Sequence, residues 1–176
     1  MAIRHGEDDH RGVDVIMIKP FKFSDLPLAA EVVRASFATV AEELGLTEQN
    51  CPRHPAFITT AERLEAYLAA GALMFGLFEG ERLVGYASLT KNGRRAYEIH
   101  NLAVLPAYRH KGYGKQLLDF CKAKAKELKG RKLVLGIIEE NTVLKAWYAA
   151  NGFAHTGTKK FDFLPFTSGY MEYTIR

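Results

Sequence analysis

The stretch Arg109-His110-Lys111-Gly112-Tyr113-Gly114 is the part of this chain that says most about its fold. It follows an apolar run, Leu102 to Leu105, and it opens an amphipathic helix expected from about Gly112 to Leu128. Two glycines at a helix start let the backbone approach a ligand and direct successive N–H groups outward, with the positive end of the helix dipole behind them. A strand, a glycine turn and a helix start in this order predict an anion-binding site.

Positive side chains at Arg109, Lys111 and Lys115 surround the same point, which favours a polyphosphate over a single carboxylate. Two better-known phosphate-binding loops do not fit. A P-loop would need a hydroxyl residue where Gln116 stands, and a dinucleotide-binding fingerprint would need a third glycine where Leu117 stands. A glycine pair before a helix is also common in ordinary turns, so the flanking sequence has to decide between a turn and an anion-binding site.

The flanks resemble two motifs of the GNAT superfamily, the acyl-CoA-dependent N-acyltransferases. Residues Glu98 to Gly114 are similar to its motif A, and Asn141 to Phe153 are similar to its motif B, with Leu144 in place of a small residue. The resemblance spans about residues 16–176 and is least specific in the first third. It implies an α/β (α+β) fold with a single GNAT-type domain. The implied sheet is mixed, mostly antiparallel and seven-stranded, with helices on both faces and splayed central strands that form an acetyl-CoA cleft.

The hydrophobic pattern predicts the element order β-α-α-β-β-β-α-β-α-β-β. A helix capped at Ser24-Asp25 is expected to end near Gly45, and a second helix is expected to open at a capping box, Thr59 to Glu62. The stretch between residues 45 and 57 is expected to be irregular. The other predicted elements are strands at 15–19, 72–78, 83–90, 96–105 and 132–138, helices at 112–128 and 142–150, and a final hairpin at 153–163 and 169–175. From this pattern alone, only a mixed sheet with helices on its faces follows.

Length and composition fit one globular domain, since the chain has 176 residues of which 48% are hydrophobic and 25% charged. We take residues 15–176 as the domain and residues 1–14 as an N-terminal extension that is disordered or non-native. No apolar run is long enough for a membrane span or a signal peptide, which predicts a cytoplasmic protein. Cys51 and Cys121 are too few for a disulfide scaffold or a metal cluster, and no metal is expected.

The positive charge is concentrated around the glycine turn. Nine Lys or Arg and only two Asp or Glu lie between Ala107 and Lys132, whereas the rest of the chain carries a net negative charge. Such a segment can bind nucleic acid, but the lysines at 115, 122, 126 and 129 form one helical stripe without interleaved aromatic residues. We interpret this stripe as a solvated helix face beside an anionic cofactor, with no nucleic-acid or membrane partner.

Transfer of an acyl group from a thioester to an amine requires a base for the amine proton, donors for the oxyanion and an acid for the departing thiolate. By motif position, the resemblance implies Glu98 as the general base and Tyr148 as the general acid. Glu98 is equally an ordinary charged residue at a strand start, and His100 on the same strand face, or water, is the substitute base. Tyr148 is otherwise a core aromatic beside Trp147.

The same resemblance implies the cofactor contacts. Asn141 would bind the pantetheine arm, although an asparagine there also caps the following helix. The backbone of Leu102 to Val104 would pair with the pantetheine amides as an added strand does. The implied cofactor-binding set is Leu102, Ala103, Val104, Arg109, His110, Lys111, Gly112, Tyr113, Gly114, Lys115, Asn141 and Tyr148.

The sequence therefore predicts an N-acetyltransferase that transfers the acetyl group of acetyl-CoA to a primary amine of a small molecule or peptide, by direct attack in a ternary complex. The alternatives are a non-catalytic acyl-CoA-binding sensor or regulatory module and, last, a nucleic-acid-binding protein. We expect the acceptor pocket between Ala41–Phe57 and the last hairpin. The hairpin aromatics, Phe161, Phe163, Phe166 and Tyr170, would line that pocket, join the core or form a homodimer interface. Cys51 to His54 is interpreted as a loop with a polar rim.

Overall fold

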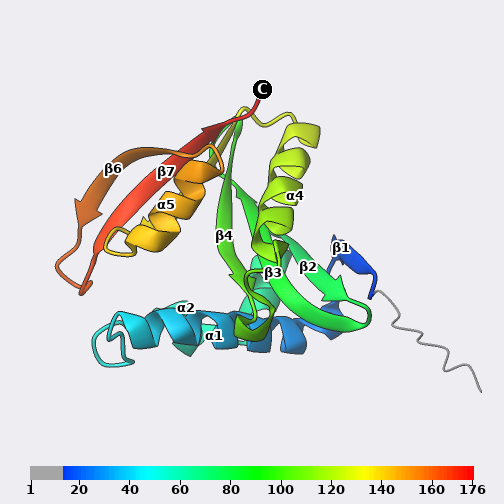
Figure 1. Ribbon diagram of the computed structural model, residues 1–176, viewed down its shortest axis with the longest axis horizontal. Coiled ribbons are helices and arrows are strands. Elements are labelled where there is room, and N and C mark those ends of the chain that lie inside the picture. The colour runs from blue at the N-terminus through cyan, green and yellow to red at the C-terminus, as the bar shows by residue number, and fades with distance from the viewer. Residues whose placement is uncertain (1–13) are drawn as a thin grey trace, which may run out of the picture.

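The computed structural model describes residues 14–176, which form one mixed sheet with helices on both faces (Figure 1). The strands are β1 (Ile16–Pro20), β2 (Leu73–Glu79), β3 (Arg82–Lys91), β4 (Ala96–Val104), β5 (Lys132–Ile138), β6 (Ala154–Lys160) and β7 (Thr167–Thr174). The helices are α1 (Leu26–Glu43), α2 (Pro55–Ile58), α3 (Ala61–Ala69), α4 (Tyr113–Glu127) and α5 (Thr142–Ala150), with 3-10 turns η1 (Phe23–Asp25) and η2 (Pro106–Tyr108). The extension predicted at residues 1–14 lies, except for Asp14, outside the described residues.

The strands of the described chain run in the order β1-β2-β3-β4-β5-β7-β6. Every neighbouring pair is antiparallel except β4 and β5, which are parallel. The seven-stranded, mostly antiparallel sheet predicted from the sequence is thereby confirmed. The parallel pair at its centre is the feature that the functional site is built around.

Two apolar clusters sandwich the middle of the sheet. On one face, α4 packs Leu117, Leu118 and Cys121 against alternate residues of β2 and β3 such as Phe75 and Leu89. On the other face, α1 and α3 pack against the remaining residues of the same strands. Because β2 and β3 are buried on both faces, their sequences are almost continuously apolar.

The region between α1 and α3 differs from the sequence-based prediction. Pro55 and the N-cap His54 start a short helix, α2, in a stretch that was expected to be irregular. The capping residue of α3 is Thr60, whose hydroxyl accepts the Arg63 N–H at 3.2 Å. The assignment of that role to Thr59 was wrong by one residue, because the Thr59 hydroxyl donates to the Pro55 carbonyl at 2.7 Å and closes α2 instead.

The central strands β4 and β5 separate soon after they meet. They pair only from Ala96 opposite Lys132 to Glu98 opposite Val134, and no further pair joins them beyond that point. A bulge in β4 accompanies the separation. Tyr86 of β3 pairs with Ala103, whereas Ser88 pairs with His100, so two residues of β4 oppose one of β3. The expected splay is present, and the part of β4 beyond Glu98 has no described strand along its β5 side.

The end of β4 is fixed to α1 by the side chain of Arg109. Its Nε donates to the Val104 carbonyl at 3.2 Å, Nη1 donates to Thr39 Oγ1 at 2.9 Å, and Nη2 donates to the Ser36 carbonyl at 2.8 Å. The planar guanidinium is suited to such a set of acceptors, because its donors are held in one rigid fork. Arg109 therefore sets where the chain leaves β4 and enters the glycine turn.

We expect Arg109→Lys to lower the free energy of unfolding by about 2 kcal/mol, because a lysine ammonium cannot serve all three acceptors and some of them lose a charged donor. Urea unfolding followed by circular dichroism measures this. Arg94→Lys in the exposed β3–β4 turn is the matched control and should leave stability unchanged. Equal stability of the two variants would contradict the structural role of Arg109.

Candidate functional site

The glycine turn forms a row of free backbone donors. His110 and Gly112 adopt left-handed φ values of 63° and 81°, and Gly112 is the N-cap of α4 without a side-chain cap. Gln116 is the first residue of this segment whose N–H is bonded inside the helix, to the Gly112 carbonyl at 3.0 Å. The N–H groups of residues 110–115 donate to no acceptor in the described part of the chain. Free N–H groups at the positive end of a 15-residue helix form a site for phosphate.

The three basic side chains around this loop, Arg109, Lys111 and Lys115, carry the same charge but make different contacts. Arg109 was expected to supply mobile positive charge, but its guanidinium is held at α1. Lys111 and Lys115 stay exposed at the loop, with Nζ of Lys115 2.6 Å from the Asp119 carboxylate. The positive groups left free at the loop are therefore its backbone donors and these two lysines.

Glu79 of β2 contacts two residues of the loop, Tyr113 and Lys111, and no sequence pattern indicated this. The buried Tyr113 donates its hydroxyl to the Glu79 carboxylate, and this bond is the main reason why the pKa of Tyr113 is raised to about 12. Lys111 Nζ lies 3.9 Å from the same carboxylate. Tyr113 thus packs over the helix start, and its side chain is committed to holding α4 on the sheet.

Helix α5 closes over the other side of the loop. A Cβ atom at Gly114 would lie 3.6 Å from the Trp147 ring, at ordinary van der Waals distance, so the ring of Trp147 packs directly against the helix start. Asn141 accepts the Leu144 N–H at 3.2 Å and caps α5, which is the simpler of the two roles expected for it. Its amide nitrogen donates to no group within residues 14–176.

Glu98 stands at the last paired position of β4 and β5, where the strands begin to separate. Its Oε2 accepts from Asn92 Nδ2 at 2.9 Å and lies 3.7 Å from Nε2 of His100. His100 Nε2 is also 2.9 Å from the Thr90 hydroxyl. The structure therefore brings the two candidate bases together on one face of β4.

Tyr148 is buried on α5 among aromatic rings. Its ring centroid is 4.9 Å from that of Trp147 and 5.5 Å from that of Phe153. Burial raises the pKa of Tyr148 above its ordinary value, so the phenol keeps its proton at neutral pH. Its hydroxyl has no hydrogen-bond partner among the residues described. Tyr148 is both a core aromatic and an available proton donor, so its two expected roles are compatible.

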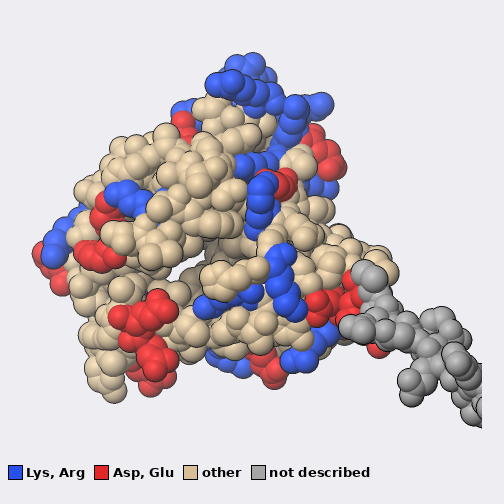
Figure 2. Space-filling view, in the orientation of Figure 1, with Lys and Arg blue, Asp and Glu red and all other residues tan. Residues whose placement is uncertain are grey.

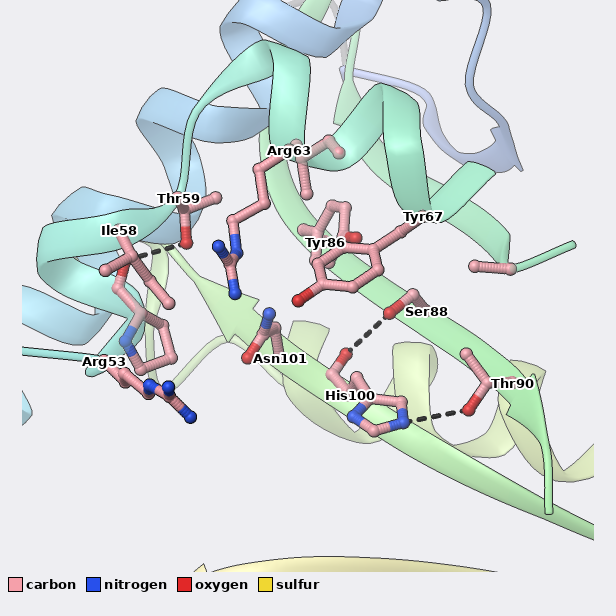
Figure 3. A pocket seen from close by; sticks show the side chains of 13 residues that line it. Arg53, Ile58, Thr59, Arg63, Tyr67, Tyr86, Ser88, Thr90, His100 and Asn101 are labelled. Atoms are coloured by element: carbon pink, nitrogen blue, oxygen red, sulfur yellow. Dashed lines mark hydrogen bonds between the residues drawn. The ribbon is translucent and has the colours of Figure 1, made fainter. Parts of the chain in front are cut away.

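A cavity of about 290 Å³ lies on the opposite face of β4 from α4 (Figure 3). Strand periodicity explains this, because Ile99 points into the core under α4 and its neighbour His100 therefore points into the cavity. Figure 3 shows Arg63 and Tyr67 of α3 facing His100 and Asn101 of β4 across this space. The lining residues are Arg53, Pro55, Ile58, Thr59, Arg63, Leu64, Tyr67, Ala72, Tyr86, Ser88, Thr90, His100 and Asn101.

The aromatic residues of the last hairpin do not line this cavity. Phe166 packs instead with Cys51 and Leu46 in a small cluster that joins the β6–β7 loop to the loop after α1. Phe163 is 70% exposed, and its ring lies 5.3 Å from that of Phe161. The stretch expected to border the acceptor pocket, Ala41–Phe57, contributes to the lining only through its last residues, Arg53 and Pro55.

The segment Cys51 to His54 is less polar in the structure than its sequence suggested. Cys51 is buried, and burial raises the pKa of its thiol. His54 is also buried, between the rings of Phe37 and Phe57, and its Nδ1 accepts the Ala56 N–H at 3.4 Å to cap α2. Desolvation lowers the pKa of His54. Only Arg53 of this segment faces the cavity.

Most of the other basic residues lie away from both features. Arg95, Lys126, Lys129, Arg131 and Arg176 gather where α4 ends and β5 begins, seen as the blue group beside the C-terminus at the top of Figure 2. Lys126 and Lys129 are exposed, as expected for a solvated face, but Lys122 is half-buried and donates to the Asn151 carbonyl at 2.6 Å.

Between residues 14 and 176, no three His, Cys, Asp or Glu side chains lie close enough together to hold a metal ion. No helix in that range is long and apolar enough to cross a membrane.

Comparison of the sequence with known proteins points to one family. A sequence model described as Acetyltransferase (GNAT) family matches residues 40–153. N-alpha-acetyltransferase RimI of Mycobacterium tuberculosis (strain ATCC 25618 / H37Rv) is 32% identical over 108 residues, which are 57% of this chain and 63% of that protein. The chain spans less than two thirds of the length of the first curated relatives that it matches.

Solved structures of lower sequence identity share the fold. The paia N-acetyltransferase from Thermoplasma acidophilum in complex with coenzyme A has a TM-score of 0.79 at 23% identity, over 91% of this chain and 99% of that one. The structure of yncA from Salmonella typhimurium with its cofactor acetyl-CoA has a TM-score of 0.68 at 21% identity, over 92% and 94%. The likeness covers the whole sheet and not only the two motifs.

The buried, uncharged His54 should make stability depend on pH. Because folding lowers its pKa, the unfolded chain binds the proton more readily, and the stabilisation is complete above about pH 6.5 and lost as the pH falls through the lowered pKa. His54→Asn keeps a capping oxygen that does not titrate, so it should weaken the loss of stability at acidic pH. Urea unfolding at a series of pH values measures both proteins, and parallel curves would show that His54 does not cause the dependence.

Proposed function

Since the chain belongs to the GNAT family of acetyltransferases, we propose that it transfers the acetyl group of acetyl-CoA to a primary amine, of a small molecule or a peptide, by direct attack in a ternary complex. The observation that carries this proposal is the arrangement around β4. The strand has an open edge toward β5, a loop of free N–H groups follows its end, and a carboxylate and an imidazole lie where the strands part.

The chain's backbone would make most of the contacts with acetyl-CoA. The N–H groups of residues 110–115 would bind the pyrophosphate, with Lys111 and Lys115 adding charge at the rim. The free edge of β4 at Leu102, Ala103 and Val104 would pair with the pantetheine amides, and Asn141 would contribute its unused amide nitrogen. Acetyl-CoA supplies a thioester, whose acetyl group is the one transferred. The relatives solved with coenzyme A or acetyl-CoA support this assignment.

Glu98 is proposed as the general base, with His100 passing the proton to it. His100 lines the cavity, whereas Glu98 does not, and the Nε2 of His100 lies 3.7 Å from Glu98 Oε2. An amine in the cavity would give its proton to Nδ1 of the imidazole, and Nε2 would release a proton to the carboxylate through one bridging water, because 3.7 Å is too long for a direct hydrogen bond. Asn92 Nδ2 donates to the same Oε2 atom of Glu98 at 2.9 Å, and this contact keeps the carboxylate beside His100.

Tyr148 is proposed as the general acid. Burial keeps its phenol protonated, and no described acceptor competes for its proton. A protonated donor beside the leaving sulfur would release a thiol, which is a better leaving group than a thiolate. Binding energy from the remote phosphate contacts would hold the thioester close to the amine.

The relay predicts how two variants combine. Glu98→Gln and His100→Gln should each lower kcat by about 100-fold, because each breaks the same path for the proton, and the double variant should lose no more than the worse single one. A thiol-release assay with a panel of amines measures kcat, and calorimetry should show unchanged acetyl-CoA binding. If His100→Gln keeps its kcat while Glu98→Gln loses it, the proton reaches Glu98 without His100.

Removal of one hydroxyl tests the acid. Tyr148→Phe should lower kcat by about 10-fold or more and leave the Kd for acetyl-CoA within about twofold, since the ring still fills the core. Tyr170→Phe, on the exposed part of β7, is the control and should keep full activity. A Tyr148→Phe protein that turns over normally, or that loses acetyl-CoA binding instead of kcat, would rule out the general-acid role.

The same assay on the wild type tests the alternative function. Binding of acetyl-CoA with no thiol release in the presence of any amine would indicate the non-catalytic acyl-CoA-binding module.

A further inference from the structure

The cavity beside His100 has a clear electrostatic character. Two of its thirteen lining residues are arginines, Arg53 from the loop before α2 and Arg63 from α3, and none is an Asp or a Glu. Figure 3 shows Arg63 reaching from α3 toward Asn101 on β4, so its guanidinium lies over the middle of the space. The two arginines come from different elements, and the fold brings them to one cavity.

Neither guanidinium has an ionic partner within residues 14–176. The contact recorded for Arg63 is with the ring of Tyr67, whose centroid is 5.6 Å from its Cζ. Arg109 shows the opposite case, since each of its three guanidinium nitrogens has an acceptor. An arginine carries five N–H donors arranged to bind carboxylate or phosphate in pairs. Arg53 and Arg63 therefore offer the cavity donors that the protein does not use.

The β4 side of the cavity is suited to an amine. His100 faces the space from β4, and the Glu98 carboxylate lies behind it, 3.7 Å from Nε2. Apolar side chains, Pro55, Ile58 and Leu64 among them, also line the cavity. Two guanidiniums, an imidazole backed by a carboxylate and some apolar wall together match a small molecule that has both an anionic group and an amine.

We propose that the acceptor is a small amine that also carries a carboxylate or a phosphate, and that Arg53 and Arg63 bind this anionic group while the amine faces His100. This inference rests on the proposed function and names its substrate class. The volume of about 290 Å³ is at the lower end for ligand pockets, which fits a small molecule. A polyamine would place its positive charges against two unpaired guanidiniums, so it should be a poor acceptor.

Matched pairs of amines test the proposal, because each pair differs only in the anionic group. The pairs are γ-aminobutyrate and its amide, ε-aminocaproate and its amide, and phosphoethanolamine and ethanolamine, with spermidine as a polycation. The phosphate pair and the carboxylate pairs together tell which anion is preferred. We expect kcat/KM to be at least about tenfold higher for the anionic member of at least one pair, and spermidine to be poor. Equal values within every pair, or a preference for spermidine, would overturn the proposal.

Variants locate the effect in the protein. Arg63→Gln and Arg53→Gln should each raise the KM for the preferred anionic amine by about tenfold and leave its kcat and the KM of the neutral partner within about twofold. Arg94→Gln removes the same charge from an exposed turn outside the cavity and should change nothing. A double variant, Arg53→Gln with Arg63→Gln, that still prefers the anionic amine as the wild type does would show that these arginines do not bind it.

A binding measurement separates this inference from the proposed function. Calorimetric titration of the same amine pairs into the wild type saturated with coenzyme A requires no acetyl transfer. Tighter binding of the anionic member, lost in the double variant, supports the cavity's preference even if no amine is ever acetylated, in which case it is the proposed function that fails. Acetylation of every amine without a difference within the pairs would support the function and overturn this inference.

Discussion

The early separation of β4 from β5 is the constraint on which the rest of the structure depends. The two strands share only the pairs from Ala96 to Glu98 before they diverge, although both remain anchored in the sheet on their other sides. The bulge opposite Ala87 bends β4, and the Ser88 hydroxyl donates to the His100 carbonyl at 3.1 Å, which holds the bent strand to β3. A sheet normally satisfies its backbone along both edges of an inner strand. Here a stretch of central strand keeps backbone groups available, with the free donors of the glycine turn directly after it.

The same strand separates two chemical environments. Its residues alternate between faces, so Ile99 belongs to the apolar core under α4 and His100 belongs to the cavity under α3. The free N–H groups follow β4 at the start of α4, whereas His100 faces the cavity on the other side of the strand. The proposed cofactor and acceptor would thus approach the point where the strands part from opposite faces, which would bring them close together for the proposed direct transfer.

How much of this could be read from the sequence depends on how far apart the interacting residues are in the chain. The glycine turn, the strands expected at 83–90 and 96–105, and the strand at Lys132–Ile138 follow from local patterns of a few residues, and the structure has them close to where they were expected. The role of Arg109 could not be found in this way, because its partners on α1 precede it by 70 and 73 residues. The contact between Glu79 and Tyr113, and the position of Arg53 and Arg63 opposite His100, also bring together residues that are far apart in the chain. Local sequence patterns therefore did not predict them. Thr59 and Thr60 differ by one position, and which of them caps α3 is decided by where α2 ends, which no local pattern shows.

The loop at residues 110–115 offers backbone groups, whereas the cavity is lined by side chains, and this difference affects what the fold can bind. The proposed phosphate site consists largely of N–H groups that every residue except proline carries, so it depends on the conformation of residues 110–115 and on the Arg109 contacts that set it. The cavity lies between β3 and β4 on one side and, on the other, side chains of α2, α3 and the loop before them, which pack on the sheet but contribute no strand to it. Substitutions there can change charge and shape without disturbing β4, because the sheet holds the strand independently. The proposed cofactor site therefore depends on the fold itself, whereas the proposed choice of acceptor depends on a few side chains that line the cavity, Arg53 and Arg63 among them.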